Sequence, residues 1–161
     1  MLKTGQKVSY STTGICVIES ITKMGEKEYY VLKPLYQKGS KVYVPKDNKA
    51  LLERIRPAIE KSEVLEIIEK AKNMPLPWIE DDGERNQTFK EILSSGDPLA
   101  LIRLIKCIYT HEQELSLNKH RLKNVDSIVF TNAQNLLHNE IAYCLDIKPE
   151  EVIDFIASHM E

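Results

Sequence analysis

Two short segments near the N-terminus have the pattern of neighbouring β-strands. Residues 28–33 are rich in aromatic and β-branched side chains, which favour a pleated surface that is buried on one side. Residues 41–48 contain Val42 and Val44, which share one face of a strand at period two. Pro45 predicts the end of this strand, because proline cannot donate a hydrogen bond to a ladder. We therefore expect these two strands to lie side by side.

Further short strands are expected on both sides of this pair. Residues 5–10 and 15–21 form β-branched runs that are separated by a turn cluster at 11–14. Residues 22–27 contain a glycine at the expected tip of a hairpin, and residues 51–56 are expected to form a short closing strand. Five short strands joined by tight turns predict a small closed barrel of the SH3-like or Tudor-like kind.

After residue 58 the apolar spacing becomes that of helices. The clearest boundary is Gly96-Asp97-Pro98, in which Gly96 ends one helix, Asp97 caps the next and Pro98 occupies its first position. The spacing predicts about five helices, over residues 62–72, 84–93, 98–115, 116–145 and 149–158. We therefore expect an α+β protein, with a β domain over 1–58 and a compact all-α bundle over 59–161.

Composition and charge limit the class of protein. The 161 residues are 42% hydrophobic and 29% charged, which is typical of a soluble globular protein. No run approaches the ~20 apolar residues that a membrane span needs, and the N-terminus has no apolar signal core, so we expect a cytoplasmic location without a membrane partner. Residues 1–58 hold 11 Lys/Arg and 5 Asp/Glu, whereas residues 59–161 hold 11 and 19. This asymmetry either reflects two surfaces with different partners or serves only solubility.

The residues that most often carry chemistry form no recognisable catalytic or metal motif. The three cysteines are widely spaced without a C-x-x-C pair, so we interpret them as buried, reduced thiols. The four histidines form no H-x-x-x-H pair, and we interpret them as surface or capping residues. The acidic run 80–82 is either a divalent cation site or a solvated loop, since it lacks the ligand spacing of a calcium loop. We expect no catalytic residue, metal, cofactor or small-molecule substrate.

Two features of the helical half point towards nucleic acid. Trp78, which follows a proline-rich segment, either fills a gap in the core or projects as an apolar wedge against a base step. Lys119, Arg121 and Lys123 form the densest positive cluster of this half. The cluster either meets DNA phosphates, which rely on Lys and Arg, or is an ordinary solvated turn.

Several segments together resemble the CarD/CdnL family of transcription regulators. The β segments resemble that family's RNA polymerase-interacting domain at residues 5–10, 14, 28–32 and 41–48. Segments of the helical half are similar to the family's DNA-contacting domain at residues 74–78, 91–97 and 145–151. The resemblance covers essentially the whole chain in family order, although the β domain alone also resembles part of transcription-repair coupling factors.

This resemblance implies a bacterial regulator that binds the β subunit of RNA polymerase. It further implies that the helical domain contacts promoter DNA at the upstream edge of the melted bubble, in the minor groove and largely without sequence preference, and stabilises the open complex. The polymerase-binding residues would be Lys23, Lys41, Tyr43, Val44 and Pro45. The DNA-binding residues would be Trp78, as the wedge, and Arg85, Lys90, Lys119, Arg121 and Lys123, which hold the backbone.

Three other functions are compatible with the same residues. The chain can be a protein-interaction adaptor that binds polymerase or another protein without touching DNA. It can be a helix-turn-helix sequence reader built from residues 139–155. An enzyme is the third alternative, and no motif in the chain supports it.

Overall fold

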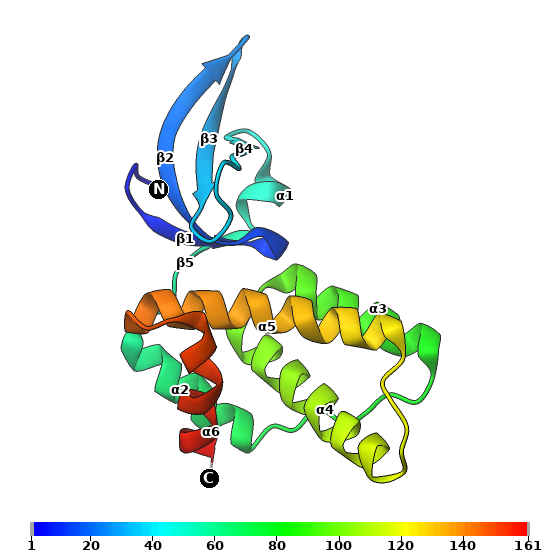
Figure 1. Ribbon diagram of the computed structural model, residues 1–161. Coiled ribbons are helices and arrows are strands. Elements are labelled where there is room, and N and C mark those ends of the chain that lie inside the picture. The colour runs from blue at the N-terminus through cyan, green and yellow to red at the C-terminus, as the bar shows by residue number, and fades with distance from the viewer. Residues whose placement is uncertain (1, 161) are drawn as a thin grey trace.

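The N-terminal part of the protein is a five-stranded antiparallel sheet. The computed structural model describes residues 2–160 and is shown in Figure 1. The strands are β1 (Lys7–Tyr10), β2 (Gly14–Met24), β3 (Lys27–Pro34), β4 (Val42–Pro45) and β5 (Ile55–Pro57), in the order β4-β3-β2-β1-β5. A 3₁₀ turn (Ser11–Thr13) joins β1 to β2, and the short α1 (Lys49–Leu52) lies between β4 and β5. We call this part the β module.

The expected pairing of residues 28–33 with 41–48 is confirmed, because β3 and β4 are antiparallel neighbours. The expected closing strand over 51–56 is wrong in its first half. Asn48 accepts a hydrogen bond from the Leu51 amide at 3.2 Å and so caps α1. The strand β5 therefore begins only at Ile55, and the order of the sheet places it beside β1, at the edge opposite β4.

The remainder of the chain is helical, and we call it the helical module. Its helices are α2 (Lys61–Lys72), α3 (Asp82–Ser95), α4 (Pro98–Leu117), α5 (Asn124–Leu145) and α6 (Val152–Met160), with a 3₁₀ turn (Pro149–Glu151) before α6. The predicted boundary at Gly96 is confirmed, since this glycine has φ 63° and the Asp97 carboxylate accepts from the Ala100 amide at 2.9 Å. The predicted helix 116–145 is wrong at its start, because Lys119 takes a positive φ of 61° and α5 begins only at Asn124.

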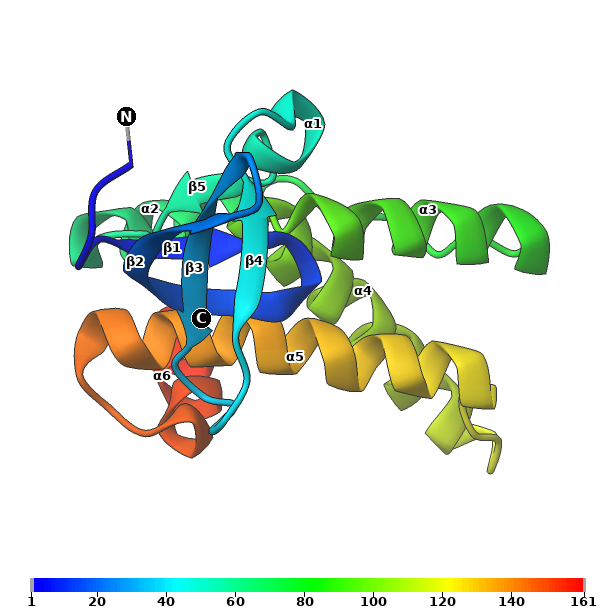
Figure 2. The ribbon, with the colours of Figure 1, turned by 90° about the horizontal axis from the view of Figure 1, so that it is seen from above.

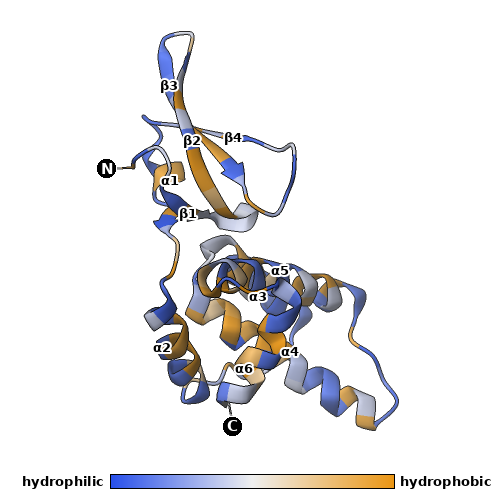
Figure 3. Cartoon of the chain, turned by 60° about the vertical axis from the view of Figure 1, so that its left-hand side comes forward, coloured by the Kyte–Doolittle hydropathy of each residue, from blue (hydrophilic) through white to orange (hydrophobic). Residues whose placement is uncertain are grey.

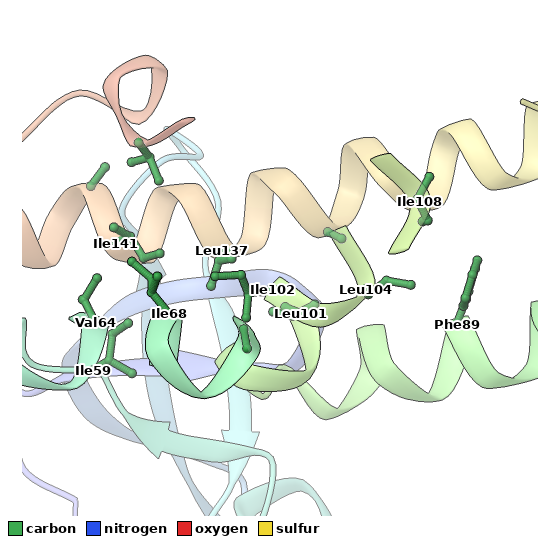
Figure 4. Packing of buried hydrophobic residues seen from close by; sticks show 14 residues of the cluster. Ile59, Val64, Ile68, Phe89, Leu101, Ile102, Leu104, Ile108, Leu137 and Ile141 are labelled. Carbon is green, nitrogen blue, oxygen red and sulfur yellow. The ribbon is translucent and has the colours of Figure 1, made fainter. Parts of the chain in front are cut away.

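Each module has its own hydrophobic cluster. The β module buries Val8, Cys16, Ile18, Tyr30, Leu32 and Val44. The helical cluster draws on α2, α3, α4, α5 and α6 and includes Ile68, Phe89, Leu104 and Leu137. Figure 4 shows Ile68, Ile102 and Leu137 gathered at one end of this cluster and Phe89 at the other. Figure 3 shows the same division, with hydrophobic residues on the inward sides of the helices and hydrophilic residues at the tip of the β2–β3 hairpin.

The β module rests on the helical module along α5 and the end of α3 (Figure 1). Both terminal nitrogens of Arg56 donate to the Glu140 carboxylate, one of them at 2.6 Å, and Arg56 also donates to the Gly96 carbonyl at 2.9 Å. The Glu140 carboxylate accepts a further bond from the Ile59 amide at 2.9 Å. Since Glu140 is only 2% exposed, this ion pair joins β5, α3, α5 and the segment before α2 inside the protein.

Candidate partner-binding surfaces

Strand β4 lies at one edge of the sheet and presents a tyrosine to solvent. Within residues 2–160, β4 is hydrogen-bonded to β3 on one side only. Tyr43 pairs with the buried Val31 across the ladder and is itself 46% exposed. Lys41, just before the strand, forms a salt bridge of 3.3 Å with Glu19. An exposed aromatic ring beside unpaired backbone groups is typical of an edge that accepts a partner segment.

Val44 does not belong to this exposed surface, contrary to the expectation that its side chain contacts polymerase. It pairs with Tyr30 across the ladder, on the inner face, and its side chain is fully buried. The alternation of a strand explains this, because Tyr43 and Val44 must point to opposite faces. Pro45, which pairs with Tyr29, is half-buried at the end of the strand.

Lys23 lies on the arm of the β2–β3 hairpin, away from the centre of β4. It is exposed and pairs with Glu28 across the ladder. Two apolar side chains of the same arm, Ile21 and Met24, are 44% and 45% exposed. The sequence placed Ile21 at the end of the predicted strand and Met24 beyond it, whereas β2 continues to Met24. Ile21 shares a face of the strand with Lys23, whereas Met24 lies on the other face.

Arg85 is a structural residue rather than an exposed DNA contact, which corrects the expectation from the sequence. It is 3% exposed, and its guanidinium donates to Asp126 at 3.0 and 3.1 Å and to Asp82 at 2.6 Å. It also donates to the Ile79 carbonyl at 2.9 Å. Burial lowers the pKa of Arg85, but the bonds to Asp126 and Asp82 outweigh burial and the pKa is raised. The guanidinium thus stays charged inside the protein, and its N–H groups are engaged in hydrogen bonds to protein oxygens.

Trp78 packs against the helical core. Its ring stacks on His111 with centroids 3.6 Å apart and meets the edge of Phe89 at 5.9 Å. The guanidinium carbon of Arg85 lies 4.7 Å from the centre of the indole. These contacts hold the ring between three side chains. They favour the gap-filling alternative over an exposed wedge.

The basic cluster lies in the connection between α4 and α5, residues 118–123. Lys119, Arg121 and Lys123 are all exposed there. Lys123 donates to Asp82 at 2.6 Å, and this bond, followed by that from Arg85, lowers the pKa of Asp82. The acidic run 80–82 therefore shares this end of the molecule with the cluster and reduces its positive potential. Lys90 is exposed on α3.

Sequence reasoning missed the two buried carboxylates, Asp126 and Glu140. Both lie on the buried stripe of α5, seven residues before and seven residues after the fully buried Ala133. This spacing places all three residues on one helical face. The sequence did contain a signal for them, namely an acidic residue on an otherwise apolar stripe of a helix. Such a residue predicts a buried ion pair, because a buried carboxylate requires a partner.

Three further features of the described residues bear on function: membrane-spanning helices, metal-binding clusters and reactive thiols. None of the helices within residues 2–160 is both long enough and apolar enough to cross a membrane. In the same range, no three His, Cys, Asp or Glu side chains gather in a way that could hold a metal ion. Burial raises the pKa of Cys16 to about 12 and that of Cys107 to about 11, so both thiols are protonated and poorly nucleophilic.

The edge strand β4 carries an exposed aromatic side chain, Tyr43, with the exposed Lys41 just before it. Residues 2–59 match the family model of the CarD-like/TRCF RID domain. No curated protein matches the chain. Residues 2–59 therefore form a domain of the CarD-like/TRCF RID kind, an RNA polymerase-interacting domain, which confirms the resemblance of the β module and supports RNA polymerase as its partner. This family is one of transcription factors and not a known class of enzyme.

Proposed function

We propose that the chain is a bacterial transcription regulator that binds the β subunit of RNA polymerase and stabilises the promoter open complex. The observation that carries this proposal is the exposed edge strand β4, with Tyr43 on its surface, inside an RNA polymerase-interacting domain. A partner strand added to β4 would gain backbone hydrogen bonds, while Tyr43 and Lys41 would supply contacts outside the ladder. In this proposal the β module is a domain of the SH3-like or Tudor-like kind over residues 1–58, and residues 59–161 form the DNA-contacting domain.

The DNA contact requires no strong affinity of its own. A chain bound to polymerase meets promoter DNA at an effective concentration of roughly millimolar for a short connection. A preference of ~1–3 kcal/mol for open over closed promoter DNA would shift that equilibrium about 5–150-fold. The exposed residues Lys90, Lys119, Arg121 and Lys123 are the candidates for phosphate contacts. Because Arg85 and Trp78 are engaged inside the protein, the proposal assigns them to support of this domain.

Replacing Tyr43 with alanine is expected to weaken binding to the polymerase β subunit at least tenfold. Truncation of a tyrosine hot spot costs ~2 kcal/mol or more, and Tyr43 is 46% exposed, so the fold should be retained. Binding of the full chain to the isolated β subunit can be measured by calorimetry. The matched control is Tyr109→Ala, because Tyr109 is 53% exposed on α4 and should leave affinity unchanged. Equal affinities of both variants and the wild type would remove Tyr43 from the interface.

Replacing Lys119, Arg121 and Lys123 together with glutamine is expected to reduce the salt dependence of promoter binding by the polymerase complex. Each lost phosphate contact lowers the slope by about one unit, so the reduction should be between about one and three. Lys123 should contribute least, since it already pairs with Asp82. The control is the triple glutamine variant at Lys61, Lys70 and Lys72 on α2. An unchanged slope in the first variant would make the cluster an ordinary solvated turn.

The adaptor without DNA contact is the second candidate function. It is favoured by the net acidic helical module and by the proximity of Asp82 to the basic cluster. The adaptor predicts normal polymerase affinity together with no salt-dependent binding to a forked promoter fragment. If the chain is the proposed regulator, it should bind both polymerase and, in a salt-dependent way, the forked promoter fragment.

A further inference from the structure

A neutral cleft lies where the β module meets α5. It encloses about 260 Å³, and its polar lining includes Thr12, Thr13, Tyr36, Asn132, Asn135 and Asn139. The threonines come from the 3₁₀ turn before β2, and Tyr36 comes from the loop between β3 and β4, which Figure 2 shows reaching across α5. The three asparagines follow one face of α5 at spacings of three and four residues. The cleft is therefore built by both modules.

The α5 side of the cleft carries no full charge. Residues 127–139 contain no Asp, Glu, Lys or Arg. Among the described residues, one hydrogen bond joins a polar side chain of this stretch to the protein, from Thr131 to the Ser127 carbonyl at 3.2 Å. The asparagine amides thus retain their donors and acceptors for another molecule. A lining of this kind offers donors and acceptors together without a net charge, which suits a neutral polar group.

An asparagine amide is matched in shape to the edge of a nucleobase. It presents a donor and an acceptor side by side, as the edges of adenine and other bases do. Tyr36, 41% exposed at the rim, offers a ring on which a base can stack. Burial raises the pKa of Tyr36, and the nearby Tyr143 raises it further. The volume is below the ~300–1,000 Å³ of typical small-molecule pockets, so one flat ring system suits it better than a larger ligand.

The surface on either side of the cleft supplies what a nucleic-acid strand needs. Val125 and Ile128, each 53% exposed, continue the asparagine face towards the start of α5, where Lys119 and Arg121 are exposed. On the β module, the exposed Lys33 and Lys38 adjoin the lining residues Pro34 and Gln37 in sequence. Positive charge outside a neutral polar cleft is the arrangement expected where phosphates position a strand and a base enters the site.

We propose that this cleft binds one unpaired nucleobase of single-stranded DNA, with Asn135 and Asn139 reading its edge and Tyr36 stacking on its face. The inference rests on the proposed DNA contact and specifies it further, since the edge of a melted bubble presents unpaired bases. Extended peptide backbone is the other neutral polar group that amide side chains bind, but the exposed lysines next to the lining residues favour a nucleic-acid strand, whose phosphates they can meet.

The test uses the isolated full-length chain, labelled with ¹⁵N, and two single-stranded hexanucleotides. One carries a base at every position, and the other has an abasic site in the centre. We expect the side-chain amide signals of Asn132, Asn135 and Asn139 to shift with the first strand and not with the second. We expect Asn135→Ala/Asn139→Ala to bind the intact strand at least fivefold more weakly than the wild type does. The affinity of this variant should be no lower for the abasic strand than for the intact strand. The control Asn86→Ala, exposed on α3, should behave as the wild type.

Identical shifts with both strands, or no shifts at all, would overturn the base site. Shifts of the asparagine amides with a neutral tetrapeptide, but not with the intact strand, would assign the cleft to peptide and overturn it as well. Because the asparagines are exposed or half-exposed, the variants should fold, and their melting temperatures verify this. Polymerase binding by the same samples is measured separately, so a failure of the base site is distinguished from a failure of the proposed regulator.

Discussion

Replacing Asp126 with alanine is expected to lower the free energy of unfolding by about 3–5 kcal/mol. The side chains of Asp126 and its partner Arg85 are 2% and 4% exposed. The change leaves the charged guanidinium buried with two donors unpaired, and breaking a buried pair from one side costs this much. Arg85 retains Asp82 and the Ile79 carbonyl, which sets the loss towards the lower end of the range. Denaturant unfolding followed by circular dichroism measures the change.

The control for this variant is Asp154→Ala on α6, where the aspartate is exposed and a change within about 0.5 kcal/mol is expected. The double variant Arg85→Met/Asp126→Leu should recover much of the lost stability, because apolar replacement of a whole buried pair is often neutral. A loss below about 1 kcal/mol for Asp126→Ala would show that water reaches the guanidinium. In that case Arg85 would again be a candidate for contact with DNA.

Replacing Glu140 with alanine is expected to destabilise the protein by about 2–4 kcal/mol and to loosen the junction between the modules. Arg56 loses its carboxylate partner and keeps the Gly96 carbonyl, whereas the Ile59 amide loses its acceptor. Because the Arg56 side chain is 27% exposed, water compensates part of the loss, and the cost falls below that of a fully buried pair. The β module keeps its own cluster, so binding to isolated polymerase should survive while the stimulation of open complexes declines.

Two measurements check this prediction. Chemical denaturation gives the loss of stability, with Glu150→Ala as a control on the exposed 3₁₀ turn before α6. Open-complex lifetime in the presence of saturating protein gives the functional effect. A destabilised variant that prolongs the open complex as well as the wild type would contradict the idea that the junction sets the position of the helical module.

Local chemistry made much of the fold predictable. The valines at 42 and 44 placed β4, and the glycine, aspartate and proline at 96–98 fixed the boundary between α3 and α4. These signals act within a few residues, so a single sequence contains them. The break at Lys119 was missed because a lysine with positive φ has no signature of its own, unlike a glycine. The helix α1 was missed because the asparagine cap competed with an apolar run that also suits a strand.

The candidate site was less predictable, because its residues depend on partners far away in the chain. Arg85 looked like an exposed basic residue, and its partner Asp126 is 41 positions away. Glu140 meets Arg56 across 84 positions. Tyr43 and Val44 are neighbours in sequence, yet only the alternation of the strand separates the exposed side chain from the buried one. Resemblance indicated the segment that the proposal uses, and the packing of the protein decided which of its side chains are exposed.

Amide hydrogen exchange of the full chain, alone and with RNA polymerase, tests most directly whether β4 is the docking edge. The account predicts that polymerase slows exchange in residues 41–44 and in the neighbouring outer residues of β3, because a partner strand pairs with the free side of β4. The helical module should show no comparable protection when promoter DNA is absent. Binding without protection of β4, or protection confined to the helices, would contradict the account.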